Sequence, residues 1–255
     1  MLIDEWRCTP LRSFVATCAL GLLAVSSLPA QVVISQVYGG GGNNGALLKN
    51  DYVELFNRSP IPVDFSGWSL QYAPGNGAAW QKVELTGTVS PGAYYLVALA
   101  AGGGGTLNLP DPDARGGIPM SASSGRIALL STLRLTSKGT ACPEGEDVVD
   151  LIGYGAGTGC RENSPIASTG NSIAAFRKDG GCRQSGENRA DFVPGEPNPR
   201  NRTTPHRACG DSMARAAETV VMQPAKGGGA YSWRVSPEAT PTSVERRSTR
   251  AKRSW

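Results

Sequence analysis

Histidine is nearly absent from this sequence, since the 255 residues contain only His206. A Ser-His-Asp or Cys-His catalytic site would depend on that one side chain, which lies in a stretch rich in Pro and Arg. No C-x-x-C pair is present, and a single histidine offers little help in holding a metal. This scarcity argues against His-based catalysis and against a zinc site.

The sequence also lacks two signatures of catalytic loops. It contains no Gly-x-Ser-x-Gly elbow of the kind that carries a nucleophilic serine. Gly39 to Gly42 follow an apolar run, as a phosphate-binding loop would, but no Gly-Lys-Ser or Gly-Lys-Thr comes after them. We interpret this run as a plain glycine loop, and we expect neither an enzyme nor a cofactor.

Long helical patterns are missing as well, because no stretch shows a convincing 3.6-residue apolar period. The chain instead has 33 glycines and 18 prolines, and these residues cost a helix interior roughly 1 and 3 kcal/mol each. Short alternating runs between Gly, Pro, Asn and Asp clusters predict strands at 32–38, 51–57, 67–72, 80–85, 93–99, 125–130, 148–154 and 171–177. Many short strands separated by turns are typical of a β-sandwich or barrel.

The strand that begins at Asp51 can face the core in two ways. If Val53 and Leu55 point inward, Glu54 points outward, because successive side chains in a strand alternate between its faces. The opposite orientation buries the aromatic side chains of Tyr52 and Phe56 instead. The pattern alone leaves both orientations open.

Two groups of side chains could form a binding face. Among the aromatic residues, alternation predicts that Trp68 and Tyr72 belong to the core and leaves Trp80 as the more open position. An acidic group that could flank a sugar or a cation consists of Glu144, Glu146, Asp147 and Asp150. We expect this acidic group to be a solvated strand edge.

The first 30 residues resemble a signal peptide. Residues 13–30 form an apolar stretch that follows Arg7 and Arg12 and ends in small residues, so cleavage is expected near Ala30. The firmly apolar part, Phe14 to Val25, is shorter than the ~20 residues that a membrane-spanning helix needs. We therefore expect a secreted, extracellular protein with no transmembrane anchor after cleavage.

Four cysteines remain once the leader is removed. An even number of cysteines in an exported chain predicts disulfides, and four cysteines allow three pairings. We expect Cys142 to pair with Cys160 and Cys182 to pair with Cys209, so that the first disulfide encloses the strand at 148–154.

Five segments in a fixed order carry a family resemblance: 33–40 (VISQVYGG), 49–57 (KNDYVELFN), 63–72 (VDFSGWSLQY), 150–155 (DLIGYG) and 191–201 (DFVPGEPNPRN). Together they resemble the lamin tail domain in the form found in secreted bacterial proteins, over about residues 32–204. The resemblance implies an immunoglobulin-like β-sandwich that serves binding or attachment. In bacteria this domain often accompanies extracellular nuclease or phosphatase domains.

The segment after Cys182 departs from that family. Relatives tend to carry an acidic Asp-Thr-Asp-like stretch there, whereas in this chain only Glu187 and Asp191 have a charge able to hold calcium. We expect a cation to bind there weakly or not at all.

The chain is predicted to have three parts: a signal peptide (1–30), a lamin-tail-like sandwich (31–210) and a disordered basic tail (211–255). Residues 31–210 contain 15 basic and 15 acidic residues, and the tail contains 8 and 4. Because the tail is rich in Ala, Gly, Ser and Pro, disorder without a partner is one expectation, and out-of-frame translation is an alternative. Weak, non-specific contact with an anionic partner would use Arg246, Arg247, Arg250, Lys252 and Arg253.

Two function hypotheses follow from these patterns. The favoured one is a secreted, non-catalytic module that attaches to a surface, a polymer or a protein partner. The alternative is an accessory part or truncated remnant of an extracellular hydrolase, such as a nuclease or a phosphatase. The sequence does not identify the ligand.

Overall fold

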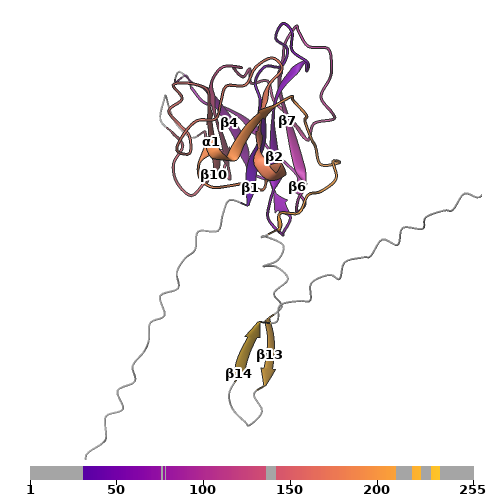
Figure 1. Ribbon diagram of the computed structural model, residues 1–255, viewed down its shortest axis with the longest axis vertical. Coiled ribbons are helices and arrows are strands. Elements are labelled where there is room, and N and C mark those ends of the chain that lie inside the picture. The colour runs from indigo at the N-terminus through magenta and orange to yellow at the C-terminus, as the bar shows by residue number, and fades with distance from the viewer. Residues whose placement is uncertain are drawn as a thin grey trace, which may run out of the picture.

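The architecture is a sandwich of two β-sheets with very little helix. We describe it from a computed structural model, which covers residues 31–75, 77, 79–135 and 142–210, together with 220–224 and 231–235. One sheet has six strands in the order β12-β11-β1-β2-β7-β8, and the other has four in the order β10-β9-β4-β5. In Figure 1, β4 and β10 lie on the left of the sandwich, and β2 and β7 lie on the right. The predicted all-β fold is confirmed.

The eight strands predicted from the sequence all belong to the two main sheets. The six-stranded sheet consists of β1 (Val32–Tyr38), β2 (Asn50–Asn57), β7 (Tyr94–Ala101), β8 (Ala114–Arg115), β11 (Ala174–Arg177) and β12 (Phe192–Gly195). The four-stranded sheet consists of β4 (Ser69–Pro74), β5 (Gln81–Glu84), β9 (Gly125–Leu130) and β10 (Val148–Tyr154). The strands β1, β9 and β10 have the predicted bounds, whereas β8 and β12 were not predicted.

The remaining elements are short. β3 (Val63–Asp64) pairs with β6 (Thr88–Val89) in a separate two-stranded ladder. A 3₁₀ helix, η1 (Lys178–Gly181), and one helical turn, α1 (Asn188–Asp191), connect β11 to β12. All pairings in the two main sheets are antiparallel except that of β7 with β8.

Apolar side chains from both sheets fill the space between them. Val53 and Leu55 of β2 belong to the same buried cluster as Leu70 of β4 and Ile127 of β9. These side chains come from strands with β-branched or aliphatic residues at alternate positions, as a half-buried strand requires. The first of the two orientations considered for β2 is therefore the one the protein adopts.

The other face of β2 is buried as well. Every residue of β2 after Asn50 is buried, and Glu54 is fully inaccessible to solvent. Glu54 therefore points outward, as the alternation predicts for this orientation, but the face on which it lies is covered instead of solvated. The reason is that the chain beyond β12 returns across this face, where Arg200 donates from Nη2 to Oε1 of Glu54 at 2.7 Å and from Nε to Oε2 at 3.0 Å.

Further donors complete the surroundings of Glu54. Its carboxylate accepts hydrogen bonds from the Arg200 backbone N–H at 2.8 Å and from Ser35 Oγ at 2.5 Å. Burial raises the pKa of Glu54, and the hydrogen bonds and charge of Arg200 oppose that rise. The Arg200 guanidinium also lies over the Tyr94 ring, at 3.8 Å from its centroid. This ion pair fixes the exit segment, which we define as residues 196–204, on the sheet.

Trp80 is buried, and Trp68 packs at the margin of the core. Trp80 is only 2% exposed and packs beside the Arg126 guanidinium, which lies 5.2 Å from the ring centroid. Trp68 is partly exposed and packs against Phe65, with ring centroids 5.2 Å apart. The suggestion that Trp80 could be an open binding residue is therefore wrong, because that side chain is part of a buried cluster.

Part of the tail has defined strands. β13 (Val220–Pro224) pairs antiparallel with β14 (Tyr231–Val235), although disorder was expected for this region. The other residues beyond Gly210 lie outside the part of the chain that the structure describes, and so does the segment predicted to be a signal peptide. For those segments the predictions stay predictions.

Removing the cation that neutralises Glu54 should strongly destabilise the sandwich. We expect Arg200→Ala to lower the free energy of unfolding by about 3–5 kcal/mol, because it leaves a buried carboxylate unpaired. The matched control is Arg202→Ala, since Arg202 is 43% exposed and forms an ion pair with Asp113 at 2.8 Å. Such a surface pair contributes about 1 kcal/mol or less. Urea denaturation of both variants measures the difference, and equal small losses would contradict the structural role of Arg200.

Candidate functional site

The glycine loop at one end of β1 is a packing device. An added Cβ at Gly41 would lie 1.9 Å from the backbone carbonyl carbon of Asn50, so only glycine fits there. Asp51 is buried beneath the loop and accepts hydrogen bonds from the backbone N–H of Gly41 at 2.9 Å and of Met120 at 2.8 Å. Burial raises the pKa of Asp51 to about 7. The carboxylate anchors this turn to the sandwich.

A second group of buried polar contacts forms around Arg177, at the end of β11. Its guanidinium donates from Nη2 to Asp150 Oδ2 at 2.7 Å and from Nε to the Ile34 carbonyl at 2.8 Å. Asp150 Oδ2 also accepts from the Ile34 backbone N–H at 2.7 Å. β1 pairs with β11 only at Gln36 and Val37. The two charged side chains therefore supply Ile34 with the partners that a longer β11 would have provided.

Asp191 provides the second carboxylate of this group. Its oxygens accept from the Ser185 backbone N–H at 2.7 Å and from Ser185 Oγ at 2.6 Å. They also lie 3.5 Å from Arg177 Nη1 and 3.4 Å from Arg183 Nε. Asp191 is fully buried, and protein donors surround both of its oxygens. We call Arg177, Asp150 and Asp191 the charged junction.

Glu187, which was considered above as a possible calcium ligand, caps the helical turn α1. Its Oε1 accepts hydrogen bonds from the Arg189 backbone N–H at 3.3 Å and from the Ser164 backbone N–H at 3.1 Å, which caps α1. Among the described residues, no group of three or more His, Cys, Asp or Glu is arranged to hold a metal ion. Whether the protein binds calcium weakly stays a prediction.

Glu162 borders the charged junction and is only partly buried. Gln184 Nε2 lies within hydrogen-bonding distance of both of its carboxylate oxygens, at 3.3 and 3.4 Å. Burial, followed by the negative charge of Asp150, raises the pKa of Glu162 to about 7, and the charge of Arg177 opposes that rise. Glu162 therefore titrates near neutral pH.

The acidic group expected at a solvated strand edge is divided by the fold. Glu144 and Glu146 are exposed, and Asp147 forms an ion pair with Arg134 at 3.4 Å. Asp150 points the other way and is 1% exposed, so for this residue the expectation of a solvated edge is wrong. Its burial follows from its place in β10, where it accepts a hydrogen bond from the Ile34 backbone N–H, which β11 does not reach. The four residues do not form one site.

The four cysteines among the described residues form the two predicted disulfides. Cys142 is bonded to Cys160, and Cys182 is bonded to Cys209. The first disulfide closes a loop around β10, and the second ties the segment after η1 to the end of the sandwich. Disulfides persist in oxidising compartments, so the two bonds are compatible with an extracellular location. No helix among the described residues is long and apolar enough to cross a membrane.

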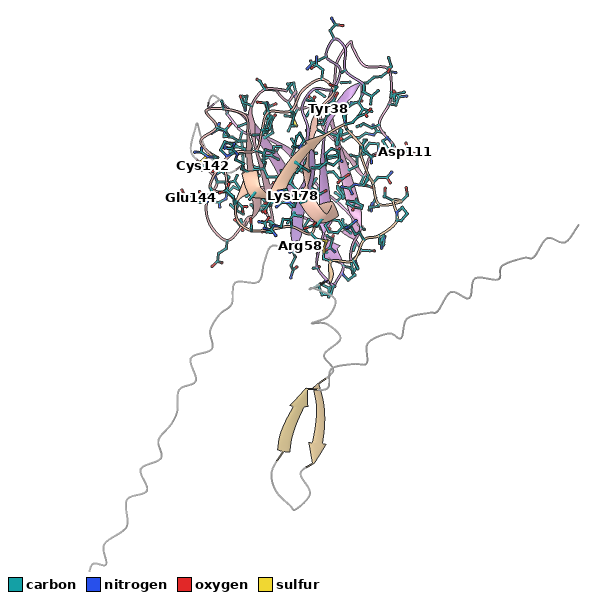
Figure 2. All side chains as sticks on the ribbon, in the orientation of Figure 1. Tyr38, Arg58, Asp111, Cys142, Glu144 and Lys178 are labelled. Atoms are coloured by element: carbon teal, nitrogen blue, oxygen red, sulfur yellow. A yellow bond between two sulfur atoms is a disulfide. The ribbon has the colours of Figure 1, made fainter. Side chains whose placement is uncertain are left out.

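Two of the cavities at the surface of the described residues are lined by segments that are distant in the sequence. One of ≈ 430 Å³ is lined mainly by small and apolar residues between Gly155 and β12, with Arg189 as its charged residue. The other, of ≈ 510 Å³, is lined by Arg58, Asp179, Cys182, Arg183, Gln184, Ser185, Cys209 and Gly210. Figure 2 places Arg58 towards the lower end of the sandwich. We call this second space the Arg58 cavity.

Sequence reasoning missed the roles of the residues that shape these sites. Arg58, Arg177 and Arg200 were assigned no structural role, because an isolated arginine has no motif that shows which carboxylate it will meet. His206, considered as a catalytic residue, is exposed. The predicted electrostatic contacts lie outside the described residues: Arg246, Arg247, Arg250, Lys252 and Arg253.

Comparison with known proteins identifies a family over half of the chain. A sequence model of the Lamin Tail Domain matches residues 26–156. Among solved structures, a DUF4876 family protein from Bacteroides thetaiotaomicron VPI-5482 is similar at 12% identity, with a TM-score of 0.46; the alignment covers 71% of this chain and 75% of that one. No curated protein matches the chain.

Titration of Glu162 should make the stability depend on pH. A carboxyl whose folded-state pKa is raised binds its proton more tightly in the folded chain, so its contribution is fully present below pH ~4.5 and is lost as the pH rises through ~7. Over this pH interval the free energy of unfolding should decrease in the wild type. We expect the decrease to be smaller by about 1–2 kcal/mol in Glu162→Gln, which lacks the titrating group. The exposed Glu144→Gln is the matched control.

Urea denaturation between pH 4.5 and 7.5 measures this difference. Asp51 contributes a slope of the same sign, so the Glu162→Gln variant should retain part of the pH dependence. Identical pH profiles for Glu162→Gln and the wild type would contradict the assigned protonation behaviour of Glu162.

Proposed function

Because the chain belongs to the Lamin Tail Domain family, we propose that this immunoglobulin-like sandwich is a secreted, non-catalytic module that attaches to a surface, a polymer or a protein. The family supports a domain that acts by binding. The proposal adds a role to the fold. It rests on the bonding partners of the carboxyl and cysteine groups among the described residues.

One observation carries this proposal: the buried carboxylates and the described cysteines already have bonding partners within the protein. Glu54, Asp150 and Asp191 accept hydrogen bonds from guanidinium, hydroxyl and backbone N–H groups of the sandwich. A catalytic acid or base must exchange a proton with a bound substrate, and a catalytic thiol must be free. These carboxylates hold strands and loops together instead, and the four described cysteines are disulfide-bonded.

The described cysteines also support export. Two disulfides in one small sandwich suit an oxidising compartment, and the apolar leader before Ala30 supplies a route to it. Outside the cell, such a sandwich can present a surface to a partner.

The tail adds an electrostatic contact in this proposal. Five basic residues lie within eight positions of the tail: Arg246, Arg247, Arg250, Lys252 and Arg253. The sandwich region 31–210 has equal numbers of acidic and basic residues. Affinity for a long polyanion such as DNA should therefore reside in the tail, and it should fall steeply with salt because counterions are released.

The proposed role can be tested with the chain from Gln31 and a version that ends at Gly210. We expect neither protein to hydrolyse DNA or phosphate esters with or without divalent metal ions. We also expect only the longer protein to bind a DNA duplex, with similar affinity for different sequences and with strong salt dependence.

Two outcomes of that experiment would count against the proposal. Metal-dependent cleavage by the purified shorter protein would show that the sandwich is an enzyme. Unchanged DNA binding after truncation would place the polyanion contact on the sandwich instead of the tail.

A further inference from the structure

The Arg58 cavity is lined by an arginine whose buried side-chain atoms Nε and Nη1 have no hydrogen-bonding partner among the residues that the structure describes. A buried donor without a partner costs about 1–3 kcal/mol, and more when it is charged. Such a group calls for an explanation, of which a bound ion is one.

Nearby carboxylates do not satisfy this guanidinium. Asp150 and Asp191 attract Arg58 electrostatically, but their oxygens accept from Arg177, Ser185 and the Ile34 backbone. Burial lowers the pKa of Arg58, and the positive charge of Arg177 lowers it further. An arginine still remains protonated in a protein. A negative charge delivered from solvent would therefore be stabilised beside Arg58.

Arg183 supplies a second cation to the same cavity. Its side chain is 53% exposed, and only its Nε approaches Asp191, at 3.4 Å. Its terminal nitrogens have no partner among the described side chains, so they can donate to a ligand. Planar guanidinium groups bind carboxylate, phosphate and sulfate oxygens through paired N–H donors. Asp179 is the only acidic residue of the lining, and it is exposed to water.

The size of the cavity suits a group larger than a single ion. A volume of ≈ 510 Å³ lies in the range of small-molecule sites, which is about 300–1,000 Å³. The Cys182–Cys209 disulfide forms part of the wall and fixes the segment that carries Arg183. The two arginines therefore come from segments far apart in the chain that the fold holds around one space.

We infer that the Arg58 cavity is a binding site for an oxyanion group, such as the phosphate, sulfate or carboxylate of a small ligand or polymer end. Arg58 binds the oxyanion at the inner end of the cavity, and Arg183 binds it from the rim. The inference deepens the proposed binding role and rests on it, but it places a site on the sandwich that does not depend on the basic tail.

Calorimetric titration of the chain from Gln31 with sodium phosphate, sodium sulfate or sodium acetate tests this site. Ionic strength is held constant with sodium chloride. The variants are Arg58→Gln and Arg183→Gln, and the matched control is Arg115→Gln, which changes an exposed arginine of β8 outside the cavity. Every protein keeps the tail, so tail binding is the same in all titrations.

We expect saturable binding of at least one of the three anions by the wild type and by Arg115→Gln. Binding should be about tenfold weaker or more in Arg58→Gln and in Arg183→Gln, the loss of roughly one charge-assisted hydrogen bond. The anion that binds most tightly identifies the class of ligand. If Arg58→Gln does not fold, the Nε–Hε resonance of Arg58 in the wild type should shift on titration with the bound anion.

The inference is overturned if none of the three anions binds saturably, which would assign the cavity to water. Equal affinities in Arg58→Gln and Arg115→Gln would also overturn it. Either result would leave the proposed tail contact intact, because that contact is measured by truncation at Gly210. The two proposals can therefore fail independently.

Discussion

The fold depends on a guanidinium that is buried between carboxylates where β1 runs beyond its neighbour β11. Arg177 and Asp150 both bind the backbone of Ile34, one through its carbonyl and the other through its N–H. Each charge would be very costly alone in the interior, but together they neutralise one another and complete a strand edge. Because Asp150 belongs to β10 and Arg177 to β11, the same contact links the two sheets.

A second buried ion pair applies the same principle on the outer face of the six-stranded sheet. Burying the Glu54 carboxylate beneath apolar residues alone would be very costly in free energy. The ion pair with Arg200 makes its burial possible. The exit segment is thereby part of the domain and covers the sheet. The Cys182–Cys209 disulfide then holds the chain beyond it at the end of the sandwich. Residues far beyond the span matched by the family model, 26–156, thus contribute to the fold.

The sequence predicted the parts of the structure that depend on local pattern. Strands β1, β9 and β10 were found because their apolar residues recur at the strand period. β12 was missed because it has four residues and includes Pro194, which weakens the pattern of a strand. The disulfide pairs were predicted from cysteine count and spacing.

The buried charges could not be predicted in this way. The alternation that buries Val53 and Leu55 places Glu54 on the outer face of β2, and no local pattern shows that Arg200, 146 residues away, covers that face. Trp80 likewise becomes buried through contacts with Arg126, which lies on another strand. The Arg58 cavity could not be predicted either. The segments that line it are far apart in the sequence, and only the fold brings them together.

Native-state hydrogen exchange tests most directly whether the buried charges unite these segments in one cooperative unit. The informative amides are those of Ile34, Asn198 and Arg200, which donate to the side chains of Asp150, Gln36 and Glu54. If the account is correct, all three exchange with the free energy of global unfolding. Rapid exchange of Asn198 and Arg200, with Ile34 protected, would show that the exit segment is a loosely attached strap and would contradict it.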